Sequence, residues 1–373
     1  MLAPLRDYLR PRDPTSSPLL ATTKEHYFAQ LSRTFSTGDP NFEEVRWILL
    51  EDANLEHLLD VFTSIDSNSE AVWEACDKFM YQLYWHKPRL VVLGPKIEAL
   101  PDNHPSKPIC LWRLSCLFDS TGNLMERQRL LAHTLTLWRE REDDFWIAQT
   151  LWALSDTNRH LDLLEEGIQQ AKEGSDIFER LGNTAKQAEC LTELAWLLSD
   201  DGQIDAAEEA ALRAIDLLPE EGENLMVCQG HRVLGDISLS KGELGKAVHH
   251  LEVALGVASS SKLVTQLFWI HFGLATVFSA EGNFRDAHTH IERAKSHVLN
   301  DTYLLARGSL LQAQLWYEQG MWEKARSEAL CVLDVFGTLG ATNNAQYTRQ
   351  FLRKLDGNVG SDPVTPEAEV PVS

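Results

Sequence analysis

Side chains able to do acid–base or metal chemistry are numerous in this sequence, but they are not spaced for it. The thirteen histidines form no His-Glu-x-x-His motif and no Cys/His spacing of the kind that binds zinc. His288 and His290 are two residues apart and therefore point to different sides of a helix, and His249 and His250 diverge in the same way. We therefore expect solvated or core-edge histidines and no metal site.

The remaining motifs for catalysis or cofactor binding are also missing. Acidic pairs such as Asp143 with Asp144 fall at turns or helix starts, where negative charge interacts favourably with a helix N-terminus. No Gly-x-Ser-x-Gly elbow is present. The stretch "LGPKIEAL" near Gly94 lacks the first Gly and the Ser/Thr of a phosphate-binding loop. The sequence therefore predicts no enzyme and no cofactor.

Composition limits the partners and the compartment. The formal charge of −21 argues against a nucleic-acid phosphate partner and against an anionic membrane surface. The first residues, "MLAPLRDYLRPRDP", carry Arg and Asp where a signal peptide has its apolar region, and no apolar run approaches the roughly 20 residues of a membrane-spanning helix. The six cysteines form no CxxC pair, so we expect reduced, mostly buried thiols and a cytoplasmic protein.

A repeated pattern organises most of the chain. Gly202, Gly242, Gly282 and Gly320 recur with a nearly constant period of about 40 residues. Each is followed by a large apolar residue at +2, a small residue at +5, and apolar or small residues at +9 and +12; in the first copy these are Ile204, Ala207, Ala211 and Ala214. A period of this length indicates a repeat architecture.

Two weaker copies precede these four. Gly122 begins one of them, with Arg127 at the position that is otherwise small. In the next copy Arg159 takes the place of the glycine, followed by Leu161 and Leu164. The pattern therefore predicts about six units.

Each unit reads as a helix hairpin. Before Gly202, the residues Leu191, Leu194 and Leu198 recur at helical spacing on one face. The glycine can reverse the chain, and the alanines of the second helix share one face and allow close approach of the two helices. One hairpin cannot bury its apolar face alone, but stacked hairpins can. We therefore expect an all-α, superhelical α-solenoid.

These residues resemble the tetratricopeptide repeat (TPR), whose pattern has large, small and glycine positions at fixed offsets. The matching residues of the third unit are Leu191, Leu194, Ala195, Leu198, Gly202, Ala207 and Ala214, and those of the fifth are His271, Leu274, Ala275, Phe278, Gly282, Ala287 and Ala294. Units of this length are similar to the longer-helix variety in kinesin light chains and in the sensor arms of signalling ATPases. The resemblance implies a right-handed superhelix and a concave groove that binds a partner.

The first hundred residues resemble fungal STAND-type, NLR-like NTPases. "MLAPLRDYLRPRDP" is similar to the end of their winged-helix domain, and the run Glu51, Asn54, Leu55 and Glu56 to the helical segment that follows it. This resemblance implies a winged-helix remnant at 1–20 and a helical linker at 21–105, before the TPR-like solenoid at 106–355. The stretch 356–373 has three prolines, few large apolar residues and no period, and this composition predicts a disordered tail. The chain then resembles the sensor region of such a protein without its P-loop domain.

Counting from the repeat markers identifies candidate groove residues. In TPR proteins the groove is lined by positions 2, 5, 9 and 12 of each first helix. The residues that this count places there are Trp112, Trp146, Trp196, Arg232, Trp269, Phe272, Arg307 and Tyr317. Aromatic side chains carry much of the binding energy of interfaces, and arginine can bind a carboxylate. The alternative is that these side chains fill the space between neighbouring units.

The sequence thus favours a non-catalytic scaffold or sensor that binds a protein or peptide segment in its groove. One alternative is a small-molecule sensor arm of a signalling or transcription ATPase, which a closed apolar pocket among Trp112, Trp146 and Trp196 would support. A second is an undetected enzyme, whose sign would be a buried carboxylate or histidine with a hydrogen-bonding partner in the groove.

Overall fold

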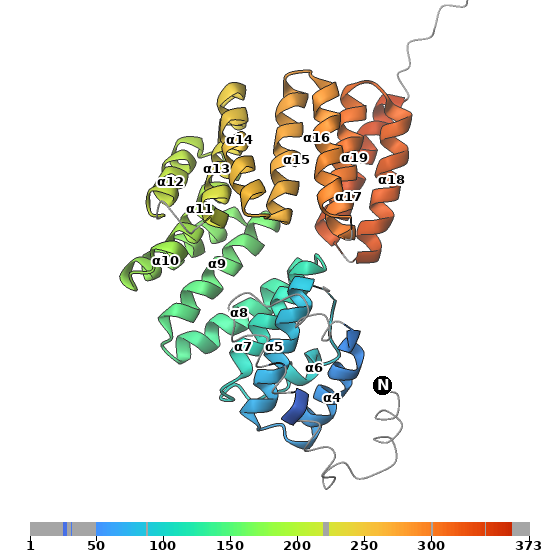
Figure 1. The fold of residues 1–373 in the computed structure, drawn as a ribbon. Coiled ribbons are helices and arrows are strands. Elements are labelled where there is room, and N and C mark those ends of the chain that lie inside the picture. Colours follow the sequence, from blue (N-terminus) through green and yellow to red (C-terminus); the bar gives the residue numbers. More distant parts are fainter. Residues whose placement is uncertain are drawn as a thin grey trace, which may run out of the picture. The chain divides into compact units, whose positions relative to one another are not determined.

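Every regular element in the described residues is a helix. The computed structural model describes residues 25–27, 31, 50–86, 89–218, 224–299, 301–339 and 341–359. No strand occurs in these ranges, so the all-α prediction is confirmed (Figure 1). The chain divides into two compact units, Met1–Asn183 and Thr184–Ser373.

The first unit contains a short helix, α6, among longer ones. Its helices are α4 (Asp52–Ile65), α5 (Glu70–His86), α6 (Gly94–Glu98), α7 (Lys107–Ser120), α8 (Leu124–Glu140), α9 (Asp144–His160) and α10 (Leu164–Arg180). Helices α7 and α8 pack as a hairpin, as do α9 and α10, and α8 packs on α9. The largest apolar cluster joins α4, α5, α7 and α8 around the fully buried Trp73 and Phe79.

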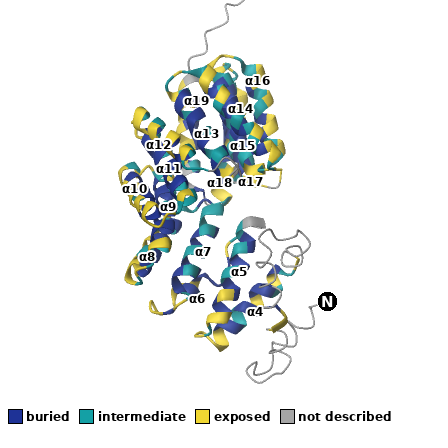
Figure 2. Ribbon diagram, turned by 60° about the vertical axis from the view of Figure 1, so that its left-hand side comes forward, coloured by how far each residue is buried: buried dark blue, intermediate teal, exposed yellow. Residues whose placement is uncertain are grey.

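The second unit is a stack of helix hairpins. It consists of α11 (Thr184–Asp200), α12 (Ile204–Asp216), α13 (Asn224–Ser240), α14 (Leu244–Ser260), α15 (Val264–Ala280), α16 (Phe284–His297), α17 (Thr302–Glu318), α18 (Trp322–Leu339) and α19 (Thr342–Val359). Each consecutive pair of helices packs together, and the first helices α11, α13, α15 and α17 also contact one another in that order. Most helices therefore have one buried and one exposed face (Figure 2). The predicted stacking of hairpins is confirmed within this unit.

The turns show a regularity that is finer than the predicted repeat. Residues with positive φ close the helices at positions 122, 142, 162, 182, 202, 242, 262, 282 and 320. Up to 282 the steps are equal except for one that is doubled, and the last step (320 − 282 = 38) is slightly shorter than a doubled one. Most of the helices between them have the same length. The turns at 142, 182 and 262, which lie between hairpins, thus share the left-handed conformation of the turns within hairpins, whereas α16 ends at Val298 with φ −124°. A left-handed residue at a helix end satisfies the last carbonyl groups of the helix, and this accounts for the glycines.

The register predicted for the α9/α10 hairpin is wrong by three residues. Arg159 lies inside α9, and the residue with positive φ is Asp162, at φ 62°. Aspartate tolerates this conformation better than most residues, and for that reason the turn survives without a glycine. Counted from Asp162, the +2, +5, +9 and +12 positions are Leu164, Gly167, Ala171 and Gly174, which match the large-then-small pattern.

Small residues set the distance between the helices of a hairpin. Ala207, Ala247, Ala287 and Ala325, at the +5 position of their repeats, are all fully buried. In the α13/α14 hairpin a Cβ atom added to Gly235 would lie 2.8 Å from Leu251 Cγ. The Leu251 side chain thus lies closer to the Gly235 backbone than an alanine there would allow without a shift.

Several predictions about the chain ends fall outside the described residues or are refined. Residues 1–20, predicted as a winged-helix remnant, are not among the described residues. Helix α19 continues to Val359, so the first residues of the predicted tail are helical. No helix within the described ranges is both long and apolar enough to cross a membrane. All six cysteines are free thiols, and Cys331 is the exposed one.

Candidate functional site

Five predicted groove residues form one continuous set in the second unit. They are Trp196 on α11, Arg232 on α13, Trp269 and Phe272 on α15, and Arg307 on α17, and we call them the arginine–aromatic row. The Arg232 guanidinium carbon lies 4.4 Å from the ring centre of Trp196 and 5.9 Å from that of Trp269. The Arg307 guanidinium carbon lies 5.0 Å from Trp269 and 5.9 Å from Phe272. Cations and rings therefore alternate across four successive first helices.

The row is partly packed and partly accessible. All five side chains are half-buried. Trp269 and Phe272 pack with one side against the cluster of Phe268, Ala294, Val298 and Leu304. Their rings are also 5.7 Å apart in an edge arrangement. Part of each of these two side chains thus fills space between repeats, as the predicted alternative states. The other part of each side chain stays accessible to solvent.

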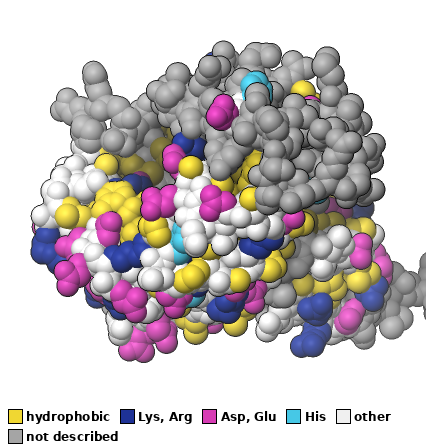
Figure 3. Space-filling model, turned by 90° about the horizontal axis from the view of Figure 1, so that it is seen from below, with side chains coloured by type: hydrophobic (Ala, Val, Ile, Leu, Met, Phe, Trp, Pro, Cys, Tyr) yellow, Lys and Arg dark blue, Asp and Glu magenta, His cyan; other side chains and the backbone are white. Residues whose placement is uncertain are grey.

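The electrostatic character of the row differs from that of the chain. The chain carries a net charge of −21, and side chains of both signs are interspersed on the face shown in Figure 3. In the row two arginines lie among aromatic rings. A guanidinium stacked on an indole keeps its N–H groups at the ring edge, where they can donate to a carboxylate.

Tyr317 lies farther along the second unit, and its contacts are with α19. The Lys354 ammonium nitrogen is 4.8 Å from the centre of the Tyr317 ring. The Phe351 ring lies edge-on at 5.8 Å. Tyr317 thus lies on a first helix, as predicted. Its aromatic and cationic neighbours, Phe351 and Lys354, are not members of the arginine–aromatic row.

Two predicted residues of the first unit contact one another. The Trp112 and Trp146 rings are 5.5 Å apart, and Trp146 stacks on Trp138 at 5.5 Å with planes 10° apart. The register correction changes how this cluster relates to the groove. Counted from Asp162, the position equivalent to Trp112 is Trp152, which the prediction missed because it used Arg159 as the marker.

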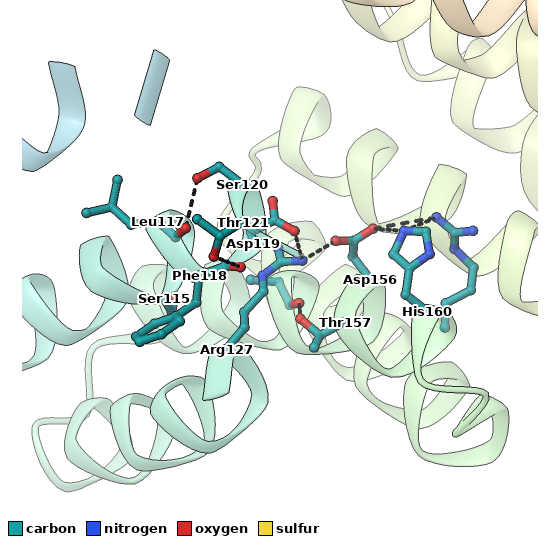
Figure 4. Close-up of polar contacts among 12 residues, drawn as sticks. Ser115, Leu117, Phe118, Asp119, Ser120, Thr121, Arg127, Asp156, Thr157 and His160 are labelled. Carbon is teal, nitrogen blue, oxygen red and sulfur yellow. Dashed lines mark hydrogen bonds and ion pairs between the residues drawn. The ribbon is translucent and has the colours of Figure 1, made fainter. Parts of the chain in front are cut away.

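A buried ion network links three helices of the first unit (Figure 4). Arg127, at the position that is otherwise alanine, donates to Asp119 at 2.8 Å and to Asp156 at 2.7 Å. Its side chain is 6% exposed, whereas those of Asp119 and Asp156 are 30% and 21% exposed. Burial alone would raise the pKa of Asp156, but Arg127, His160 and Arg159 outweigh it and hold that pKa below its usual range. Asp156 therefore stays ionised at neutral pH, whereas burial raises the pKa of Asp119 above its usual range.

Histidines that are far apart in sequence meet across the hairpins of the second unit. His231 Nδ1 on α13 lies 3.2 Å from His250 Nδ1 on α14. His271 Nδ1 on α15 lies 3.0 Å from His290 Nδ1 on α16. The spacing of neighbouring histidines in the sequence does not indicate these pairs. The signal that could have found them is the period, because each member recurs at the same position of the next repeat.

These contacts bear on the two alternative functions. The predicted sign of an enzyme was a buried carboxylate or histidine with a hydrogen-bonding partner in the groove. The ion network lies in the first unit and the histidine pairs join the two helices of a hairpin, so neither belongs to the arginine–aromatic row. In the network both carboxylates are paired with the Arg127 guanidinium. Trp112 and Trp146, two of the three tryptophans named for a small-molecule pocket, pack directly on each other. In the described part of the chain no group of three or more His, Cys, Asp or Glu side chains is arranged to hold a metal.

Comparison with known proteins establishes the fold. No family model matches the sequence, and no curated protein does. Among solved structures, a Rap protein complexed with competence and sporulation factor has a TM-score of 0.59 at 13% identity, over 92% of this chain and 99% of that one. The fold is that of TPR-like helical repeat proteins.

Two further TPR-like structures have a similar extent. The Rap conjugation gene regulator of plasmid pLS20, in complex with the Phr* peptide, has a TM-score of 0.51 at 11% identity, over 94% of this chain and all of that one (100%). Aspartyl phosphate phosphatase F from Bacillus subtilis has a TM-score of 0.50 at 12% identity, over 92% of this chain and 97% of that one. At these identities the likeness concerns the fold alone.

Proposed function

We propose that this chain is a non-catalytic scaffold or sensor that binds a protein or peptide segment on the first-helix face of its TPR-like repeats. The observation that carries the proposal is the arginine–aromatic row. Trp and Arg are among the residue types that contribute most of the binding energy in protein interfaces. Here they are contributed by four successive helices and held by mutual stacking, which lowers the ordering entropy lost on binding.

The row favours a segment that presents both apolar and acidic side chains. Arg232 and Arg307 can donate to carboxylates, and the rings between them offer apolar contact. A protein with a net charge of −21 repels most acidic segments, so a local cationic site would select where such a segment binds. Two of the similar structures are of Rap proteins in complex with a partner factor or peptide, and this supports a peptide-sized ligand.

The remaining predicted residues are kept as candidate contacts within their own units. In the second unit this residue is Tyr317. In the first unit they are Trp112 and Trp152, which replaces Trp146 because of the corrected register. A cytoplasmic location and an origin as the sensor region of a STAND-type protein are further parts of the proposal.

The test is a binding measurement with defined peptides. A displayed library of short acidic and neutral peptides is selected on the full chain, and the peptides obtained are titrated by fluorescence anisotropy. We expect Trp269→Ala and Arg307→Gln each to weaken binding by about 5- to 30-fold, the effect of losing about 1–2 kcal/mol. Arg293→Gln, an exposed arginine on the second helix α16, is the charge-matched control and should leave the dissociation constant unchanged.

Two outcomes would contradict the proposal. Row variants that bind the selected peptides as tightly as the wild type would move the interface elsewhere. Equal affinity for acidic peptides and for their Asn/Gln counterparts would show that Arg232 and Arg307 do not bind carboxylates of the segment.

A further inference from the structure

The two histidine pairs occupy the same place in consecutive hairpins. His231 and His271 both lie eleven residues before the glycine of their turn, and His250 and His290 both lie eight residues after it. The Nδ1–Nδ1 distances are 3.2 Å and 3.0 Å. The same arrangement has thus formed twice, at a separation of one repeat.

The fold does not require histidine at these positions. In the preceding α11/α12 hairpin the two equivalent residues are Leu191 and Ala210, and both are buried. In the α7/α8 hairpin they are the buried Leu111 and Leu130. Apolar side chains therefore suffice to pack the two helices. Replacing an apolar pair by two imidazoles in adjacent repeats adds polar atoms that packing alone does not explain.

Two imidazole nitrogens at this distance need either a shared proton or a bound cation between them. Their lone pairs repel unless one nitrogen carries a proton that it donates to the other, or unless both bind a cation. A metal ion about 2.0–2.1 Å from each nitrogen would make an N–metal–N angle of about 91–106° across the observed separations. This range lies between the ideal values for square or octahedral and for tetrahedral coordination, so the N–N separations are compatible with a shared metal ion.

The surroundings of the pairs favour the neutral imidazole that a metal requires. Burial, followed by the partner histidine, lowers the pKa of His271 to about 4. The pKa values of His231, His250 and His290 are lowered as well, in each case mainly by burial. The charged groups that act on the pairs are Glu208 and Lys246 for His250, Arg293 and Asp286 for His290, and Arg293 for His271.

A third imidazole lies beside each pair. The His249 ring is 5.6 Å from that of His250, and the His297 ring is 5.6 Å from that of His271. The His271 and His297 planes are parallel within 9°, so they do not converge on one point. Each pair therefore offers two protein ligands and leaves the other coordination positions to water or to an external group. Three of the four paired histidines are half-buried and thus accessible to an ion; His271 is buried.

We propose that each histidine pair is a binding site for a borderline divalent transition-metal ion, such as Zn²⁺ or Cu²⁺, which links the two helices of its hairpin. Imidazole nitrogen suits these ions, whereas Mg²⁺ and Ca²⁺ prefer oxygen ligands. The sites lie on the helices that carry Arg232 and Trp269, so an ion would stiffen the hairpins that hold the arginine–aromatic row. The metal sites themselves do not depend on the proposed peptide binding.

The test is a titration of the metal-free full chain with ZnCl₂ at pH 7.5 by isothermal calorimetry. Three variants accompany the wild type: His231→Leu with His250→Ala, His271→Leu with His290→Ala, and all four changes together. These changes copy the apolar pair of the α11/α12 hairpin and should therefore preserve the fold. His57→Ala, an exposed histidine on α4, is the control.

We expect two saturable sites in the wild type and in the control, one in each double variant and none in the quadruple variant. In the wild type, Cu²⁺ should show an electron paramagnetic resonance spectrum with coupling to two nitrogens, a readout that does not depend on any variant folding. Absence of saturable binding in the wild type, or equal binding by the quadruple variant, would overturn the proposal. So would a pH dependence of stability that disappears in the quadruple variant while no metal binds, because the pairs would then share only a proton.

Discussion

The ion network around Arg127 allows a sharp test of how this repeat tolerates a charge in place of its usual alanine. We consider Arg127→Ala, which restores the common residue but leaves Asp119 and Asp156 facing each other. Removing one partner of a fully buried ion pair costs about 3–5 kcal/mol, whereas an exposed pair contributes about 0–1 kcal/mol. The two carboxylates are 30% and 21% exposed and can be partly rehydrated. We therefore expect a loss of about 2–3 kcal/mol, between these two limits.

The assay should be local, because a repeat chain with two units need not unfold in one step. Amide hydrogen exchange in α7, α8 and α9, measured by mass spectrometry, reports the opening free energy of these helices. A loss of about 2–3 kcal/mol corresponds to exchange that is about 30- to 150-fold faster. The helices of the second unit provide the internal control and should exchange at the wild-type rate.

A second variant separates charge from packing. In the α15/α16 hairpin and the following α17, the residues equivalent to this network are Ser279, Ala287 and Gln314. The triple variant Arg127→Ala with Asp119→Ser and Asp156→Gln copies that neutral combination and should recover most of the lost protection. Unchanged exchange in Arg127→Ala, or a triple variant no more protected than the single one, would refute the electrostatic account.

Three further predictions concern the second unit. Gly235→Ala should destabilise the α13/α14 hairpin by about 1–3 kcal/mol through overpacking, while Gly245→Ala, with open space around it, should be neutral or stabilise by up to about 1 kcal/mol; urea midpoints compare the two, and equal effects would argue against the close contact. The free energy of unfolding should fall by up to about 3 kcal/mol as the pH drops from about 6.5 to 4, because the unfolded chain binds a proton that folded His271 does not; urea unfolding of His271→Leu with His290→Ala should show a much flatter profile, and an unchanged slope would exclude the pair as its source. Asp301→Ala, which removes the side chain that accepts a hydrogen bond from the Leu304 N–H at 2.9 Å, should cost about 1 kcal/mol in thermal unfolding; a midpoint equal to the wild type's would show that the cap contributes nothing.

The fold could be predicted because its determinants are local and repeated. Each determinant acts within one hairpin: a glycine at the turn, a small residue at +5 and apolar residues at helical spacing. Because four copies share this pattern, it remains recognisable even where a single position departs from it. The register was predicted wrongly at Arg159 because this hairpin has no glycine at its turn. The turn needs a residue with positive φ, and Asp162 adopts that conformation although it is less favourable for aspartate than for glycine. A search for glycine at a fixed spacing does not find such a residue.

The side-chain partnerships were harder to predict, for a different physical reason. They join positions on different helices, such as Arg127 with Asp156 or His231 with His250, and each depends on which rotamers fit a particular gap. The stacking of Arg232 and Arg307 on Trp269 is of the same kind. The position of each residue on a first helix follows from counting, but the alternation of cations and rings becomes visible only when the helices are placed side by side.

The common turn geometry at equal intervals along the chain has a consequence for how such a chain can change in length. Where two turns between helices share one backbone conformation, the hairpin between them can be duplicated or excised. The flanking helices are then still connected by a turn of the same conformation. Recombination between copies would then yield longer or shorter variants of the second unit that fold, whereas the three-helix charge network of the first unit ties α7, α8 and α9 to one another and makes that segment indivisible.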